Sequence, residues 1–175
     1  MIFVNFKDYP NGKREKGQQL VEICRQVQKQ SGVPIYPVID GRFEGGVLLN
    51  HSSRPMTLIQ VKNFLTQFSA LKTLVCCSTI EEGKSLAALK PCYLAYEVPE
   101  LVGGRVAVSM AQPRAIRDLV ESVRPLPVLA GAGVHQKEDV IRAVQTGAVG
   151  VLVSAAVMTA LEPEKVLKDL AEGFK

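Results

Sequence analysis

The sequence has no apolar run that approaches the length of a membrane-spanning helix. Its apolar start at Met1–Val4 is interrupted at once by Asn5 and Lys7, whereas a signal peptide needs a longer apolar region after its basic start. We therefore expect a cytoplasmic protein.

The sequence also lacks the patterns of a metal site and of a nucleic-acid-binding surface. Its four cysteines show no C-x-x-C spacing, and its two histidines lie far apart in the chain, so there is no zinc pattern. The net charge of +4 could attract a small anion, but no long basic block accompanies it. We expect reduced thiols, no metal or organic cofactor, and neither nucleic acid nor membrane as a partner.

What the chain does contain is a regular alternation of two kinds of segment. It has 175 residues, 47% of them hydrophobic and 22% charged, a composition typical of one soluble globular domain over 1–175. Seven segments are short and continuously apolar, which is typical of strands buried on both faces: Ile2–Phe6, Pro34–Ile39, Gly46–Leu49, Thr73–Cys77, Tyr93–Glu97, Val128–Ala130 and Val149–Val153.

Amphipathic segments with helical spacing lie between most of these strands. They are Gln18–Lys29, Thr57–Phe68, Pro113–Val123, Glu138–Val144 and Pro163–Leu170, with Ile80–Leu89 as a weaker candidate because it contains a glycine. This alternation implies right-handed βαβ units and a parallel sheet. One link, Asp40–Gly46, is too short for a parallel crossover. The strands that it joins form a hairpin, or are not neighbours in the sheet, or have lost a unit between them.

Polar residues and small-residue loops follow the ends of several predicted strands. Asn5 and Lys7 are two apart and share a face, His51 follows the third strand, and the last two strands end in Gly131-Ala132-Gly133 and Ser154-Ala155-Ala156. In a (β/α) barrel these strand ends converge on one face, where the last two loops form a phosphate site. Taken singly, His51 could be a core histidine and Lys7 a surface lysine.

Glu97 ends the fifth predicted strand and leads into a loop that contains a proline and two adjacent glycines. A carboxylate at the end of a buried strand is poorly solvated, so we expect its pKa to rise toward the range useful for a base. Taken alone, Glu97 could instead cap the helix that follows or pair with a lysine.

Several motifs, in one order along nearly the whole chain, resemble the triosephosphate isomerase family, particularly its short archaeal type. They are Val4-Asn5-Phe6-Lys7, Leu49-Asn50-His51-Ser52, the segment from Ala95 to Gly103, Val108-Ser109, the segment from Leu129 to Val134, and the segment from Gly150 to Ser154. The resemblance implies a TIM-barrel-like α/β fold, shortened to about seven strands. These strands either tilt differently and close the barrel or leave a gap in it.

The family also implies a role for each matching residue. Glu97 would be the base that moves a proton between two carbons of a triose phosphate, His51 a neutral imidazole that polarises the carbonyl, and Lys7, with Asn5 alongside, the cation that stabilises the enediolate. These roles are carried over from the family, in which this division of labour is well known. The phosphate would lie on the backbone at Val102, Gly103, Gly131, Gly133, Ser154 and Ala155. Charge logic agrees independently, because an enediolate needs a cation and hydrogen-bond donors in a dry site.

The chain departs from the family at two points that bear on activity. Ser53 stands where the family has an acidic residue that helps to hold the lysine, so we expect Ser53→Glu to improve the activity. Roughly one strand and two helices are missing between Ile39 and Val47, and we expect the resulting gap to favour a homo-oligomer through Pro34–Gly46, with Tyr36 and Phe43 as contacts. Two alternatives to an isomerase stay open: an impaired or inactive barrel remnant that binds phosphorylated metabolites, and another phospho-sugar isomerase or aldolase.

Overall fold

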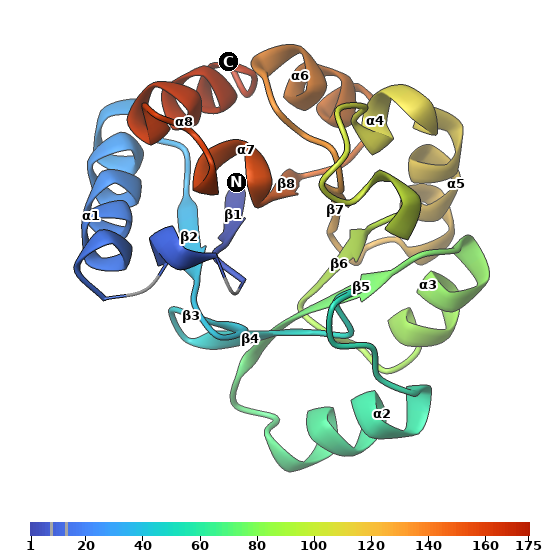
Figure 1. Cartoon of the computed structure of the whole chain (residues 1–175). Coiled ribbons are helices and arrows are strands. Elements are labelled where there is room, and N and C mark those ends of the chain that lie inside the picture. Colours follow the sequence, from blue (N-terminus) through green and yellow to red (C-terminus); the bar gives the residue numbers. More distant parts are fainter. Residues whose placement is uncertain (8, 13) are drawn as a thin grey trace.

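The strands form one curved sheet in the computed structural model, which describes residues 1–7, 9–12 and 14–175 (Figure 1). They are β1 (Ile2–Asn5), β2 (Ile35–Val38), β3 (Arg42–Phe43), β4 (Gly46–Leu49), β5 (Lys72–Cys77), β6 (Tyr93–Tyr96), β7 (Val128–Gly131) and β8 (Gly150–Val153). Their order is β2-β1-β8-β7-β6-β5-β4-β3, and only the β3–β4 pair among these ladders is antiparallel. All seven predicted strands are present, and the predicted TIM-barrel-like α/β fold is confirmed.

Helices lie outside the strands around much of the barrel (Figure 1). They are α1 (Arg14–Ser31), α2 (Leu58–Gln67), α3 (Ile80–Ala87), α4 (Val108–Ala111), α5 (Pro113–Val123), α6 (Lys137–Gln145), α7 (Ala155–Met158) and α8 (Pro163–Glu172), with 3₁₀ turns at Pro10–Gly12 and Pro99–Leu101. The six predicted helices are all present. The sequence did not predict α4 and α7, because four residues are too few to show a helical period. In the described part of the chain, no helix is long and apolar enough to cross a membrane.

The short link between β2 and β4 contains two tight turns with β3 between them. Ile39 and Arg42 exchange both backbone hydrogen bonds around Asp40 and Gly41, whose φ angles of 49° and 76° match the turn that Asp-Gly favours in hairpins. The chain then turns again, and β3 pairs with β4. Of the alternatives that the sequence left open, β2 and β4 are therefore not direct neighbours, because a two-residue strand lies between them.

This link leaves the barrel open along one line, the seam between β2 and β3. Within the described residues, β2 makes a ladder with β1 only, and its other edge is joined to β3 solely by the isolated Ile39–Arg42 bridge. A strand edge with unpaired backbone groups can pair with another chain. Of the two outcomes that the sequence left open, a closed barrel and a gap, the structure shows the gap.

Aromatic side chains fill the interior of the barrel next to the seam. The Phe3 ring lies 4.8 Å from Tyr36 and 5.0 Å from Phe43, between ring centroids. Phe43 is only 7% exposed. The prediction that Phe43 contacts another copy of the chain is therefore wrong, because β3 directs this ring into the barrel, where Phe3 covers it.

Gly83 has a packing role in α3. A Cβ atom at this position would lie 2.5 Å from Cδ1 of Leu119 in α5, so the glycine allows the two helices to approach closely. The residue that weakened the helix prediction is thus explained by tertiary contact.

Candidate active site

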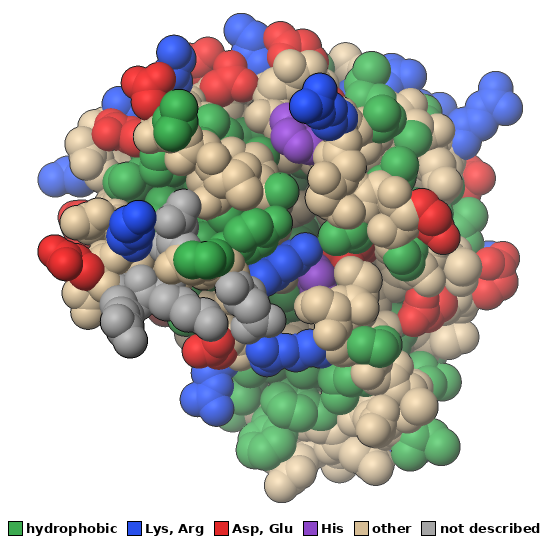
Figure 2. All heavy atoms as spheres, in the orientation of Figure 1, with side chains coloured by type: hydrophobic (Ala, Val, Ile, Leu, Met, Phe, Trp, Pro, Cys, Tyr) green, Lys and Arg blue, Asp and Glu red, His purple; other side chains and the backbone are tan. Residues whose placement is uncertain are grey.

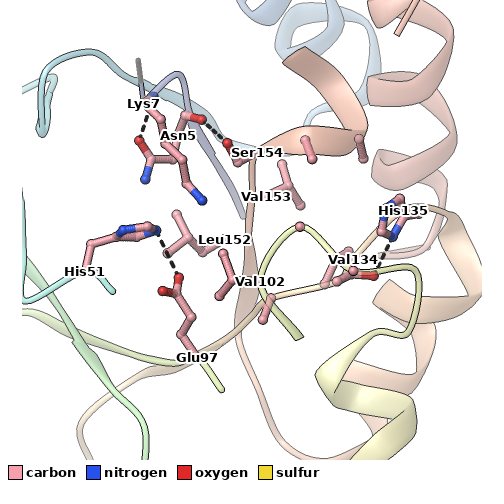
Figure 3. A pocket seen from close by; sticks show the side chains of 16 residues that line it. Asn5, Lys7, His51, Glu97, Val102, Val134, His135, Leu152, Val153 and Ser154 are labelled. Atoms are coloured by element: carbon pink, nitrogen blue, oxygen red, sulfur yellow. Dashed lines mark hydrogen bonds and ion pairs between the residues drawn. The ribbon is translucent and has the colours of Figure 1, made fainter. Parts of the chain in front are cut away.

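A narrow cleft lies where the carboxyl ends of the parallel strands converge (Figure 3). Nine of the ten predicted site residues line it: Asn5, Lys7, His51, Glu97, Val102, Gly103, Gly133, Ser154 and Ala155. Its open volume is about 30 Å³, so the cleft is small in this conformation.

His51 and Glu97 face each other across this cleft, as Figure 3 shows. His51 Nε2 lies 3.2 Å from Glu97 Oε2, and each residue is only 5% exposed. The backbone N–H of Ser53 donates to His51 Nδ1 at 3.1 Å. Since Nδ1 accepts this bond, we assign the ring proton to Nε2, which donates it to the carboxylate. His51 is thus held as a neutral imidazole whose N–H points into the cleft.

The Glu97 carboxylate has a lowered pKa, contrary to the prediction from sequence. Burial alone would raise this pKa, but the hydrogen bonds that the carboxylate accepts from His51 and Ser52 outweigh burial and lower the pKa. The Ser52 backbone N–H lies 3.3 Å from Glu97 Oε1. Strand-end burial was the right cause to expect, but the partners on the loop after β4 outweigh it. Glu97 is therefore an ionised, desolvated carboxylate, as a proton acceptor must be.

Asn5 and Lys7 reach the cleft from the end of β1. The Lys7 backbone N–H donates to Asn5 Oδ1 at 3.1 Å, and Lys7 has a left-handed φ of 46°, so a tight local turn holds the two side chains. Burial lowers the pKa of Lys7, while the Glu97 carboxylate opposes that shift. Ser154 Oγ donates to the Asn5 carbonyl at 2.6 Å and ties the end of β8 to the end of β1.

The predicted phosphate residues divide into two groups. Gly133, Ser154 and Ala155 line the cleft, and Gly133 has a φ of 68° with no room for a side chain, since a Cβ atom would lie 2.0 Å from the Val106 carbonyl oxygen. The loop that contains Val102 and Gly103 also lines the cleft, but the Val102 N–H donates to the Pro99 carbonyl at 3.1 Å. This donor is occupied in the present conformation.

Gly131 lies beneath Glu97 and does not line the cleft. A Cβ atom on Gly131 would lie 3.4 Å from Glu97 Cβ and 3.7 Å from Glu97 Oε2. The absence of a side chain at the end of β7 therefore leaves space for the carboxylate.

Two polar residues near His51 were missed as site residues. Ser53 Oγ lies 2.8 Å from His51 Nδ1, so the serine that replaces the acidic residue of the family contacts the imidazole. Asn50, with a φ of 55°, donates to the Cys76 carbonyl at 2.9 Å and accepts from the Met56 N–H at 2.8 Å, which holds the loop that carries His51. The run Asn50-His51-Ser52-Ser53 at a strand end was the available signal.

The titratable side chains of the site suit proton transfer to and from a carbon atom of an organic substrate. Within the described residues, no three His, Cys, Asp or Glu side chains gather closely enough to hold a metal ion. A neutral N–H donor, an ionised carboxylate and a half-buried lysine in one small cleft are the groups that enolate chemistry requires.

Solved structures with similar folds support the architecture alone. Thiamine phosphate pyrophosphorylase from Pyrococcus furiosus aligns with a TM-score of 0.65 at 19% identity, over 98% of this chain and 94% of that one. N-acetylmannosamine-6-phosphate 2-epimerase from Clostridium perfringens aligns with a TM-score of 0.61 at 13% identity, over 89% and 86%.

Sequence comparison is more specific. The model of the family described as triosephosphate isomerase matches residues 45–170. The triosephosphate isomerases of Saccharolobus solfataricus and Methanothermus fervidus are 32% and 30% identical, over 97% of this chain and 93% and 96% of theirs. The second alignment spans 214 positions, and 97% of 175 residues is about 170, so about 44 positions have no residue in this chain. The chain belongs to the triosephosphate isomerase family, as a shortened member of the archaeal type.

Proposed function

We propose that the protein is a triosephosphate isomerase, which interconverts dihydroxyacetone phosphate and glyceraldehyde 3-phosphate through an enediolate. The observation that carries this proposal is the buried His51–Glu97 pair, 3.2 Å apart, in a cleft that Lys7 and Asn5 also line. Membership in the family supports the same reaction.

Each side chain has a defined role in the proposed reaction. The ionised Glu97 takes a proton from the carbinol carbon next to the carbonyl, and the electron pair of that bond forms the enediolate double bond. The His51 Nε2–H and the Lys7 ammonium stabilise the charge on the oxygens, with the Asn5 side chain beside them. Glu97 then returns the proton to the neighbouring carbon, and the hydroxyl proton passes from one enediolate oxygen to the other, so the carbonyl moves by one position. The direct His51–Glu97 bond must open first, because the substrate lies between the two groups.

The phosphate is proposed to lie at the other end of the cleft. The glycine at 133 keeps the loop after β7 close, and the first N–H groups of α7 at Ser154 and Ala155 have no partner within their own helix. Gly103 and Val102 would join them once the loop at 102–104 closes on the ligand, and Gly131 would contribute by leaving room for Glu97.

A coupled assay with both triose phosphates tests the proposal directly. Wild type should interconvert them, and Glu97→Gln, which keeps the shape but removes the acceptor charge, should be inactive with unchanged folding. Equal rates for the two proteins would contradict the isomerase function and leave a phosphate-binding barrel in its place.

We also propose that the protein works in the cytoplasm, as a homo-oligomer that forms through 34–46. The unpaired edge of β2 and Ile39, which is 39% exposed, support the association. The four free thiols, three of them buried, fit a reducing compartment, where the reaction would serve glycolysis and gluconeogenesis. Sedimentation of a clean monomer at high micromolar concentration would contradict the association, and recovery from a secreted fraction would contradict the compartment.

A further inference from the structure

A second and much larger hollow adjoins the cleft and has no part in the proposed reaction. It has a volume of about 760 Å³ and runs from Lys7 and His51, over β3 and β4, to α2 and the turn that follows it. We call it the α2 groove. Figure 2 shows apolar surface in this lower part of the molecule, next to the charged side chains at the centre. A volume of this size is typical of sites for small organic ligands.

The α2 groove is continuous with the candidate active site. Asn5, Lys7 and His51 line both hollows, whereas Gly133 and Ser154 line the cleft only. The three shared residues therefore lie between the phosphate end of the cleft and the groove. A phosphorylated substrate held at the phosphate end would direct its remote carbon past Lys7 and His51 toward the groove.

The walls of the α2 groove are mainly apolar, with cations at its rim. Leu48, Phe64, Phe68 and Leu71 lie along it, and Phe68 and Leu71 are 41% and 38% exposed. The groove lining also includes Lys7 and Arg42, which lies in β3. Exposed apolar side chains in such a hollow favour an organic group over water.

We propose that the α2 groove is a substrate subsite, and that the enzyme also acts on phosphorylated α-hydroxyketones with an apolar substituent on the carbinol carbon remote from the phosphate. This inference rests on the proposed isomerase function and extends its substrate class. Such a substrate has the carbonyl between the phosphate-bearing carbon and a CH(OH) carbon that carries the substituent.

The reaction would use the same groups and needs no co-reactant. Glu97 takes the proton of the substituted carbinol carbon, and the C–H electron pair forms the enediolate double bond. The proton returns to the former carbonyl carbon, and the hydroxyl proton passes from the oxygen of the substituted carbon to the former carbonyl oxygen beside the His51 Nε2–H. The carbonyl is then on the substituted carbon. No electrons are gained or lost overall, and the substituent stays in the α2 groove throughout.

Two hydroxamates that mimic the enediolate provide the binding test. In phosphoglycolohydroxamate the nitrogen stands for the remote carbon, and its N-benzyl derivative places a phenyl ring where the substituent would lie. Calorimetry on wild type should show that the N-benzyl compound binds at least as tightly as the parent. Leu71→Arg should weaken the N-benzyl compound about tenfold or more and leave the parent unchanged.

Ile59→Arg is the matched control, because Ile59 is 70% exposed on α2 and does not line the groove. If Leu71→Arg does not fold, Phe68→Ala removes a wall of the groove instead and should weaken the N-benzyl compound selectively. Turnover is read from Glu97-dependent exchange of the carbinol proton of benzyl-substituted dihydroxyacetone phosphate into deuterium oxide.

The outcomes separate this inference from the proposed function. Binding of the parent without the N-benzyl compound would overturn the subsite and leave the isomerase intact. Failure of both compounds would overturn both. Residues 40–43, 45 and 46 line this groove, so the homo-oligomer proposed through 34–46 would cover part of it, and the two proposals compete. If the N-benzyl compound fails and Leu71→Arg converts a sedimenting dimer into a monomer, a second copy of the chain occupies the groove and the subsite is refuted.

Discussion

Removing the hydroxyl of Ser53 tests whether this residue positions the His51 imidazole for its proposed role. Ser53 Oγ lies 2.8 Å from His51 Nδ1, and the Ser53 backbone N–H donates to the same atom at 3.1 Å. Ser53→Ala keeps the backbone donor and loses only the hydroxyl contact. The tautomer of His51 should therefore survive, while the ring becomes freer to turn away from Glu97.

The expected loss is modest. A neutral hydrogen bond contributes about 0.5–1.5 kcal/mol. Ser53 is exposed, so water competes for the contact, and we expect the lower part of that range, about 0.5–1 kcal/mol. At about 1.4 kcal/mol for each factor of ten in rate, kcat should fall about two- to fivefold.

The coupled isomerase assay measures this loss, with Ser53→Thr as the control that restores a hydroxyl. In a His51→Gln background the same substitution should have no effect on kcat, because the serine acts through the imidazole. An equal loss in both backgrounds, or no rescue by threonine, would refute the positioning role.

The same contact changes the expectation for Ser53→Glu. From the sequence, a glutamate at 53 was expected to improve activity by giving Lys7 a partner. In the structure the substitution also removes the hydroxyl from His51 Nδ1 and puts a carboxylate beside the imidazole, which favours its charged form. We now expect a lower rate, and a higher one in the coupled assay would show that lysine orientation matters more.

Four further substitutions test other parts of the site. Glu97→Asp should reduce kcat about 100-fold or more with an unchanged circular dichroism spectrum, since the set-back carboxylate misses the proton; a loss below tenfold would contradict Glu97 as the base. The Glu97 carboxyl signal in carbon NMR should titrate below 4.5, and His51→Gln should raise that pKa because burial then prevails; an unmoved titration would contradict the His51 contact. Since the pKa of Glu97 is depressed in the folded state, the stability that this group contributes is present above its ordinary pKa and is lost as pH falls through the folded value. Gly103→Ala must only accommodate a φ of 74°, at a cost of about 1–2 kcal/mol, whereas the alanine of Gly133→Ala also meets the Val106 carbonyl. Gly133→Ala should therefore lower Tm more than Gly103→Ala, and it should abolish the rise in Tm that we expect from phosphate. Equal effects of the two substitutions would contradict the close loop packing.

Local sequence patterns determined most of the elements of this protein. Continuous apolar runs marked all seven parallel strands, because strands covered on both faces have no polar side to reveal. Helical spacing together with a proline at the first position gave α5 its observed bounds, Pro113–Val123. Strand ends followed by Lys7, His51 and Glu97 were enough to bring these residues to one face, since parallel strands in a barrel point their carboxyl ends the same way.

Tertiary structure alone decided how these groups act on one another. The pKa of Glu97 depends on His51, 46 positions earlier in the chain, and burial without that partner would have the opposite sign. The role of Gly131 beneath the carboxylate and the contact of Ser53 with the imidazole likewise depend on which strand ends meet. The course of the link at 40–45, which buries Phe43 in the barrel and leaves one edge of β2 unpaired, depends on how far the shortened barrel can close. Strand patterns arise from neighbours in sequence, whereas barrel closure sets the distances between side chains on different strands, and no local pattern encodes those distances.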